Sequence, residues 1–163
     1  MTKQVFTNGS NSIKFSGMKK EITIFLTDDD HDDHELFIET VTDSYSNFRV
    51  KSFYNGVELM TELNNERSEN IIETKLPDLI VLDLNMPLLD GYEVSTKIKS
   101  NSKLKNIPIF VLTTSEFEYD KIKAIAYGAN QFFTKSATKK GLTEILNVMF
   151  ATILSKNDKQ LQT

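Results

Sequence analysis

The sequence predicts an α/β fold of the doubly wound kind, a (βα)5 arrangement in which helices cover both faces of a five-stranded parallel sheet. Short apolar segments alternate five times with longer segments of helical periodicity over residues 21–154, and this alternation is typical of such a sheet. Three of the apolar segments are nearly unbroken, as expected for parallel strands buried on both faces. With 163 residues, of which 39% are hydrophobic, the chain is long enough for one buried core and too short for two.

The expected elements follow from these patterns. Strands are expected at 22–27, 48–53, 79–82, 109–112 and 131–134. Helices are expected at 33–45, 56–66, 90–100, 118–127 and 138–154, with Gly128 as a C-terminal cap. Residues 1–20 and 155–163 are polar and are expected to form flexible tails, and the polar stretch 64–75 is either more helix or a loop.

The composition excludes several classes of protein. The chain has no cysteine, which excludes disulfides and thiolate metal sites and favours a cytoplasmic location. Its apolar runs are far shorter than the roughly 18 residues of a membrane-spanning helix, and its first twenty residues lack the apolar block of a secretion signal. A net charge of −4 without a long basic stripe gives no electrostatic reason to expect nucleic-acid binding. We therefore expect no membrane and no nucleic-acid partner.

Polar side chains follow four of the five expected strands. Asp28 and Asp29 follow the first strand, Asp83 the third, Thr113 the fourth and Lys135 the fifth. Ligands of open α/β sheets bind beyond the carboxyl ends of the strands. Carboxylates brought together there repel one another unless a cation neutralises them, and Mg²⁺ prefers oxygen ligands and keeps positions open for phosphate oxygens. Since a carboxylate can itself attack phosphorus, these residues indicate Mg²⁺-dependent phosphoryl chemistry.

Four segments resemble the signature of response-regulator receiver domains of two-component phosphorelays. They are Thr-Asp-Asp-Asp at 27–30, Asp-Leu-Asn-Met-Pro-Leu-Leu-Asp-Gly-Tyr-Glu at 83–93, Leu-Thr-Thr-Ser at 112–115 and Phe-Phe-Thr-Lys-Ser at 132–136. The resemblance covers about 21–154 and implies a flavodoxin-like sheet of order 2-1-3-4-5. It also implies a signalling phosphoprotein, not a conventional enzyme, that receives its phosphoryl group from a sensor histidine kinase or a histidine phosphotransfer protein. The signal would pass to a downstream protein, as in the similar single-domain regulators paired with bacterial phytochrome kinases.

The same resemblance implies roles for four residues at the first and third strand ends. Asp83 is the implied phosphoacceptor. Asp29 is the implied direct ligand of Mg²⁺, and Asp28 binds the ion more often through water. Asp83 and the backbone carbonyl of Asn85 complete the implied ligand set.

The implied phosphoryl-binding and switch residues lie on the fourth and fifth strands. Thr113 and Lys135 are expected to contact the phosphoryl group. Phe132 occupies the aromatic switch position, without the phenolic hydroxyl of the common tyrosine. Ser136 replaces a proline that often follows a cis peptide bond, which leaves the isomer of the Lys135–Ser136 bond open.

The remaining acids near the first strand have a structural interpretation. Asp30, Asp32 and Asp33 are expected in a solvated turn and in a first helical turn, where the helix dipole favours acids. A calcium loop starting at Asp28 is rejected because Asp33 stands where such a loop needs glycine. We expect His31 and His34 to be exposed, Asp90 to cap the third helix and Gly91 to relax the turn before it.

Two other functional classes use related chemistry. A haloacid-dehalogenase phosphatase also has an aspartate nucleophile and Mg²⁺. In that class the nucleophile lies on the first strand and a second Asp follows it by two residues. Here Asp83 follows the third strand, and the residue two positions later is Asn85. A nucleotide-binding switch needs a G-x-x-x-x-G-K-[ST] loop, and the chain contains none.

The last helix carries the expected partner face. Its core row is predicted to be Leu142, Ile145, Leu146, Met149 and Ile153. Phe150 and Leu154 lie beside this row and widen it, which is typical of a partner site. We expect them, with the fourth helix and fifth strand, to form a homodimer or effector-docking face, unless the N-terminal tail covers them.

Overall fold

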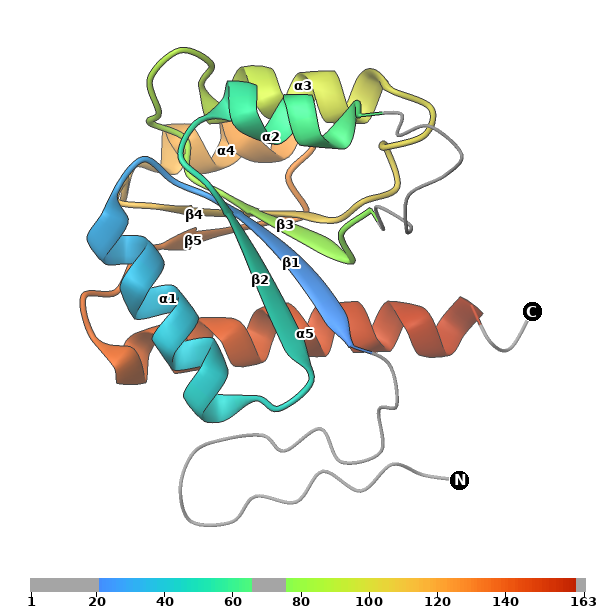
Figure 1. The fold of residues 1–163 in the computed structure, drawn as a ribbon. Helices are drawn as coiled ribbons and strands as arrows, with labels where there is room; N and C mark the ends of the chain where they lie inside the picture. The colour runs from blue at the N-terminus through green and yellow to red at the C-terminus, as the bar shows by residue number, and fades with distance from the viewer. Residues whose placement is uncertain (1–20, 66–75, 161–163) are drawn as a thin grey trace.

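The computed structural model describes residues 21–65 and 76–160, with side chains described up to Ile153 (Figure 1). The expected N-terminal tail and nearly all of the stretch 64–75 lie outside the described residues. The five strands are β1 (Ile22–Thr27), β2 (Phe48–Phe53), β3 (Leu79–Leu82), β4 (Ile109–Thr113) and β5 (Gln131–Thr134). The five helices are α1 (His31–Ser44), α2 (Gly56–Leu63), α3 (Gly91–Ser100), α4 (Glu118–Ala126) and α5 (Lys139–Gln160).

All five strands are parallel and lie in the order β2-β1-β3-β4-β5, which confirms the predicted fold. Helices α1 and α5 cover one face of the sheet, and α2, α3 and α4 cover the other (Figure 1). The chain moves from β1 outward to β2 and then back across to β3. The reversal of direction at β1 and β3 creates the crevice in which sheets of this kind bind ligands.

Side-chain caps fix where α1 and α3 begin. The Asp30 carboxylate accepts hydrogen bonds from the backbone N–H groups of Asp32 and Asp33, so α1 begins at His31, two residues earlier than predicted. Asp90 accepts from the N–H of Glu93, whose carboxylate accepts from the N–H of Asp90. This capping box confirms the structural role predicted for Asp90.

The backbone requires glycine at positions 91 and 128. A Cβ atom on Gly91 would lie 2.3 Å from the carbonyl oxygen of Asp83 and 2.8 Å from Cα of Leu84. Gly91 is therefore needed for the close approach of α3 to the site loop, and the predicted relaxation of a turn is not the reason. Gly128 has a φ of 105° directly after α4, as expected for a C-terminal cap.

The structure corrects the predictions for α5. The helix continues to Gln160, six residues past its predicted end, because the sequence over 155–160 contains no glycine or proline that would stop it. Phe150 is only 1% exposed, and its ring packs on those of Tyr45 and Phe48 at centroid distances of 4.9 and 4.2 Å. Phe150 is therefore core and cannot present a partner face, whereas the Leu154 side chain lies outside the described part of the chain.

Candidate functional site

The sheet itself carries the candidate residues to one edge. The N–H of Asp83 donates to the carbonyl of Thr27, 2.9 Å away, and the N–H of Lys135 donates to that of Thr113, 2.8 Å away. The pairing of adjacent strands thus extends into the first residue beyond β3 and β5. The order of the strands, β1 beside β3 and β4 beside β5, then brings Asp28, Asp83 and Lys135 to one place.

Three carboxylates form a group that could hold a metal ion. Asp28, Asp29 and Asp83 each offer one oxygen, and these oxygens lie within 4.8 Å of one another. Asp28 and Asp83 are buried and Asp29 is exposed, so the group opens to solvent on one side. An all-oxygen, anionic donor set fits a hard divalent cation such as Mg²⁺. Asn85 is exposed two residues beyond Asp83, and its predicted role as a carbonyl ligand stays a prediction.

Backbone N–H groups orient two of these carboxylates. The N–H of Leu84 donates to Oδ1 of Asp83 at 2.7 Å, and the N–H of Asp30 donates to Oδ1 of Asp28 at 3.1 Å. Burial raises the pKa of Asp28 above its ordinary value, although the hydrogen bonds from Lys135 and the Asp30 N–H act in the opposite direction. A buried carboxylate of this kind gains from a bound cation.

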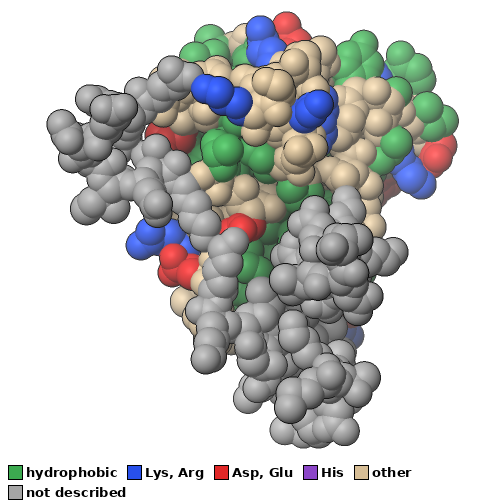
Figure 2. Space-filling view, turned by 90° about the vertical axis from the view of Figure 1, so that its right-hand side faces the viewer, with side chains coloured by type: hydrophobic (Ala, Val, Ile, Leu, Met, Phe, Trp, Pro, Cys, Tyr) green, Lys and Arg blue, Asp and Glu red, His purple; other side chains and the backbone are tan. Residues whose placement is uncertain are grey.

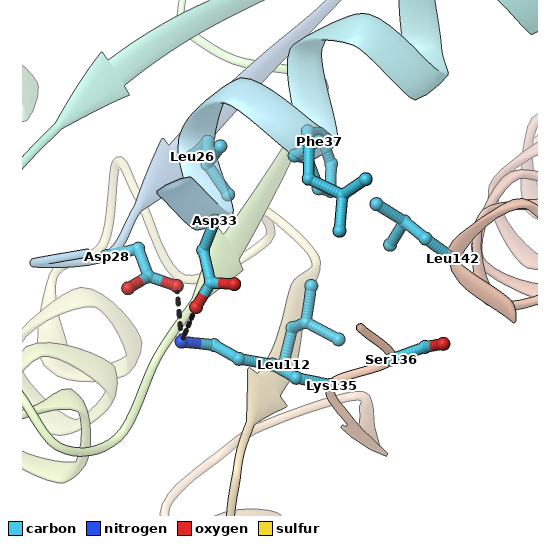
Figure 3. Close-up of a pocket in the computed structure, with 9 residues that line it drawn as sticks. Leu26, Asp28, Asp33, Phe37, Leu112, Lys135, Ser136 and Leu142 are labelled. Carbon is cyan, nitrogen blue, oxygen red and sulfur yellow. Dashed lines mark hydrogen bonds and ion pairs between the residues drawn. The ribbon is translucent and has the colours of Figure 1, made fainter. Parts of the chain in front are cut away.

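Lys135 lies at the centre of the site. Its Nζ is 2.8 Å from Oδ2 of Asp28, 2.7 Å from Oδ2 of Asp33 and 3.4 Å from Oδ2 of Asp83, and Figure 3 shows the first two contacts. Burial alone would lower the pKa of Lys135, but its hydrogen bonds to Asp28 and Asp33, together with the negative charges of Asp83 and Asp28, outweigh burial and raise that pKa. The ammonium therefore stays protonated at neutral pH.

The prediction for Asp33 missed this ion pair. The sequence placed Asp33 with Asp32 in a solvated first turn, and the structure places only Asp33 against Lys135. A helix that begins at the carboxyl edge of a sheet turns some side chains of its first turn toward that edge. The position of Asp33 in the first turn of a helix that follows β1 was therefore the sequence signal for a contact with the site.

The prediction that His34 is exposed was wrong, because its side chain is only 2% exposed. Its Nε2 lies 2.9 Å from the carbonyl oxygen of Asp28, and its Nδ1 lies 2.9 Å from Oγ of Ser52. A carbonyl can only accept, so we assign the proton to Nε2, and Nδ1 accepts from the Ser52 hydroxyl. His34 thereby ties β2 to the loop that carries Asp28, whereas His31 is exposed as predicted and stacks on Tyr54.

The predicted switch residues line the same end of the sheet. The Thr113 hydroxyl is buried and has no hydrogen-bond partner among the described residues. Phe132 is half-buried and packs on a small cluster that includes Val111 and Ala124. The described chain contains no cis peptide bond, so the bond between Lys135 and Ser136 is trans.

Comparisons with known proteins agree with this architecture. Residues 24–147 match the model of the response regulator receiver domain. The chain is 36% identical over 124 residues to response regulator Rcp1 of Synechocystis sp., covering 76% of this chain and 82% of Rcp1. A crystal structure of the phosphorylated cyanobacterial phytochrome response regulator RcpA matches with a TM-score of 0.73 and 36% identity, over 83% of this chain and 96% of that one.

A second solved structure includes a divalent ion. The Mn²⁺-bound form of Rcp1 matches with a TM-score of 0.65 and 36% identity, covering 76% of this chain and 88% of that one. The matched region contains all four sequence segments of the signature, from the first aspartates to Lys135. The chain therefore belongs to the response regulator receiver domain family and is a protein of two-component signal transduction.

Proposed function

We propose that Asp83 accepts a phosphoryl group in a Mg²⁺-dependent reaction, with a sensor histidine kinase or a histidine phosphotransfer protein as donor. The observation that carries this proposal is the position of Asp83. It is a buried carboxylate 3.4 Å from Lys135 and within 4.8 Å of two further carboxylate oxygens. The comparisons give no support to the alternative, a phosphatase of the haloacid-dehalogenase type.

The proposed transfer requires only charge and alignment from the chain. A carboxylate oxygen of Asp83 attacks phosphorus, the new O–P bond forms, and the P–N bond to the donor histidine breaks with its electrons passing to the imidazole. Asp28, Asp29, Asp83 and the Asn85 carbonyl would hold Mg²⁺, which supplies positive charge to the transferring group. The Lys135 ammonium supplies a second positive charge from within the chain. The same residues would also assist later hydrolysis of the acyl phosphate.

Thr113 and Phe132 support a conformational output. A buried hydroxyl without a partner is costly, and a phosphoryl oxygen on Asp83 would give Thr113 an acceptor. Movement of Thr113 toward that oxygen would leave room for Phe132 to follow, which biases an equilibrium between two states. This is the proposed link between the site and the surface of the domain.

The output surface is proposed to lie on α4, because Phe150 of α5 is buried. Four large side chains on and just before α4 are exposed, namely Phe117, Tyr119, Ile122 and Ile125, and Ile122 is 62% exposed. This surface would bind a second copy of the chain or a downstream protein. Basic side chains lie scattered on the described part of the face seen in Figure 2, which gives no support to nucleic-acid binding.

We propose that phosphoryl transfer to this chain takes place in the cytoplasm, because a chain without cysteine is typical of a reducing compartment. No helix in the described part of the chain has the length and apolar character needed to cross a bilayer.

Labelling with a small acyl phosphate tests the proposed function. The wild type with Mg²⁺ should gain one phosphoryl group that alkali and hydroxylamine remove, and neither Asp83→Asn nor metal-free wild type should gain it. Asp90→Asn, which changes a helix cap outside the site, is the matched control and should label normally. Undiminished labelling of Asp83→Asn would contradict the proposal, and sustained turnover of simple phosphate esters would favour the phosphatase instead.

A further inference from the structure

Asp33 has no part in the proposed ligand set or phosphoryl contacts, yet it makes the shortest ion pair of Lys135. The distance from Nζ is 2.7 Å to Asp33, against 3.4 Å to Asp83. The side chain of Lys135 is 11% exposed and that of Asp33 is 36% exposed, so solvent screens the pair only in part.

The surroundings of Lys135 restrict where its ammonium can go. A small cavity beside the lysine is lined mainly by apolar side chains, including those of Leu26, Phe37 and Leu112 (Figure 3). Apolar side chains offer no acceptor to the ammonium. Its described acceptors are the carboxylates of Asp28, Asp33 and Asp83, at 2.8, 2.7 and 3.4 Å from Nζ. The single Nζ lies among them, so a movement toward Asp83 lengthens its distance to Asp33.

We propose that Asp33 is a positioning residue that draws the Lys135 ammonium away from Asp83 and competes with the phosphoryl group for it; this inference rests on the proposed function. For Lys135 to contact a phosphoryl oxygen on Asp83, it must loosen its contact with Asp33. The negative charge of Asp33 also opposes the negative charge added by phosphorylation. Both effects have the same sign, so Asp33 disfavours the phosphorylated state.

The neighbouring Asp32 provides a matched control. Asp32 is exposed and carries the same charge in the same helical turn, but the described ion pairs of Lys135 do not include it. Asp33→Asn and Asp32→Asn remove equal charge from adjacent positions. Only the first removes a negative charge that is paired with Lys135.

The test compares these variants by affinity for a phosphoryl mimic, by the lifetime of the acyl phosphate and by NMR. With Mg²⁺ and beryllofluoride, Asp33→Asn should bind the phosphoryl mimic about two- to fivefold more tightly than the wild type, the range expected for a partly exposed ion pair, and its acyl phosphate should last longer by a similar factor. Asp32→Asn should match the wild type in both. In metal-free protein, NMR signals of the Lys135 Nζ group should shift in Asp33→Asn and stay in place in Asp32→Asn.

Four outcomes overturn the inference. Equal effects of the two substitutions would mean that only net charge matters. Weaker binding by Asp33→Asn would mean that Asp33 supports the contact between Lys135 and the phosphoryl group. If the wild type forms no adduct and takes no label, the proposed function fails and the competition fails with it. If the wild type forms a normal adduct and all variants bind the mimic with equal affinity, only the proposed competition is overturned.

Discussion

Phe150 and Asp28 are almost equally buried, at 1% and 3% exposure, yet burial has opposite consequences for them. Phe150 lies in an aromatic cluster with Tyr45 and Phe48, where removal of apolar surface from water stabilises the fold. Asp28 lies at the carboxyl edge of the sheet, where burial raises its pKa because it disfavours the charged form. The core therefore holds side chains whose burial stabilises the fold, whereas the carboxyl edge of the sheet holds a buried charge that costs stability and serves the chemistry of the site.

Truncation of Phe150 should have the largest effect on stability. Phe150→Ala should lower the free energy of unfolding by about 3–5 kcal/mol, because it opens a cavity between rings that are held by α1, β2 and α5. Urea unfolding monitored by circular dichroism measures this loss.

Val148 offers the control on the same helix. It is exposed, and Val148→Ala should change the free energy of unfolding by no more than about 0.5 kcal/mol. A loss for Phe150→Ala as small as that for Val148→Ala would mean that Phe150 faces solvent, as the sequence first indicated.

Neutralisation of Asp28 should have the opposite sign. Without a divalent metal at pH 7, Asp28→Asn should raise the free energy of unfolding by about 0.5–2 kcal/mol, the usual size of a stabilising substitution. The folded-state pKa of Asp28 is raised above its ordinary value of 3.8, so the folded chain binds the proton more tightly than the unfolded chain. Stability from this group therefore falls as pH rises from about 3.8 through the folded pKa, and the advantage of Asp28→Asn should vanish in acid.

Mg²⁺ provides the second half of this experiment. Millimolar Mg²⁺ should raise the melting temperature of the wild type and have much less effect on Asp28→Asn. Asp29→Asn should also lose the Mg²⁺ response, but its exposed position gives it little to gain in metal-free protein. A metal-free Asp28→Asn variant less stable than the wild type would show that its ion pair with Lys135 outweighs its burial.

Most of the fold could be predicted from the sequence because buried parallel strands are short apolar runs bounded by polar residues. The run at 79–82 ends at Asp83, and its limits as β3 were predicted to the residue. The start of α1 was missed because the cap at Asp30 lies among other acids that could equally serve. The environment of Phe150 could not be read from the periodicity of α5, because its partners Tyr45 and Phe48 lie about a hundred residues away.

The site was predictable where strand ends determine it. Asp28, Asp29 and Asp83 come together as expected because they directly follow β1 and β3. Asp33 and His34 were misjudged because their positions depend on how α1 is rotated against the sheet. His34, Phe37 and Val41 are buried at helical spacing, so the apolar row of α1 carried a signal for His34 that its polar neighbours obscured.

Tyr45 combines both kinds of burial, because it places one polar atom inside the aromatic cluster. Its hydroxyl donates to Oδ1 of Asn147 at 2.7 Å, and Tyr45→Phe should cost about 1 kcal/mol at pH 8, the usual net value of such a bond. Burial raises the pKa of Tyr45 from 10.0 to about 12, so the stability from this group is full below pH 10 and falls as pH rises toward 12. The Tyr45→Phe variant has no hydroxyl at this position, so its stability lacks this pH-dependent contribution. The lysines titrate alike in both proteins. The gap between wild type and variant in urea unfolding should therefore narrow between pH 8 and pH 11, and an unchanged gap would show that the hydroxyl is as accessible as in the unfolded chain.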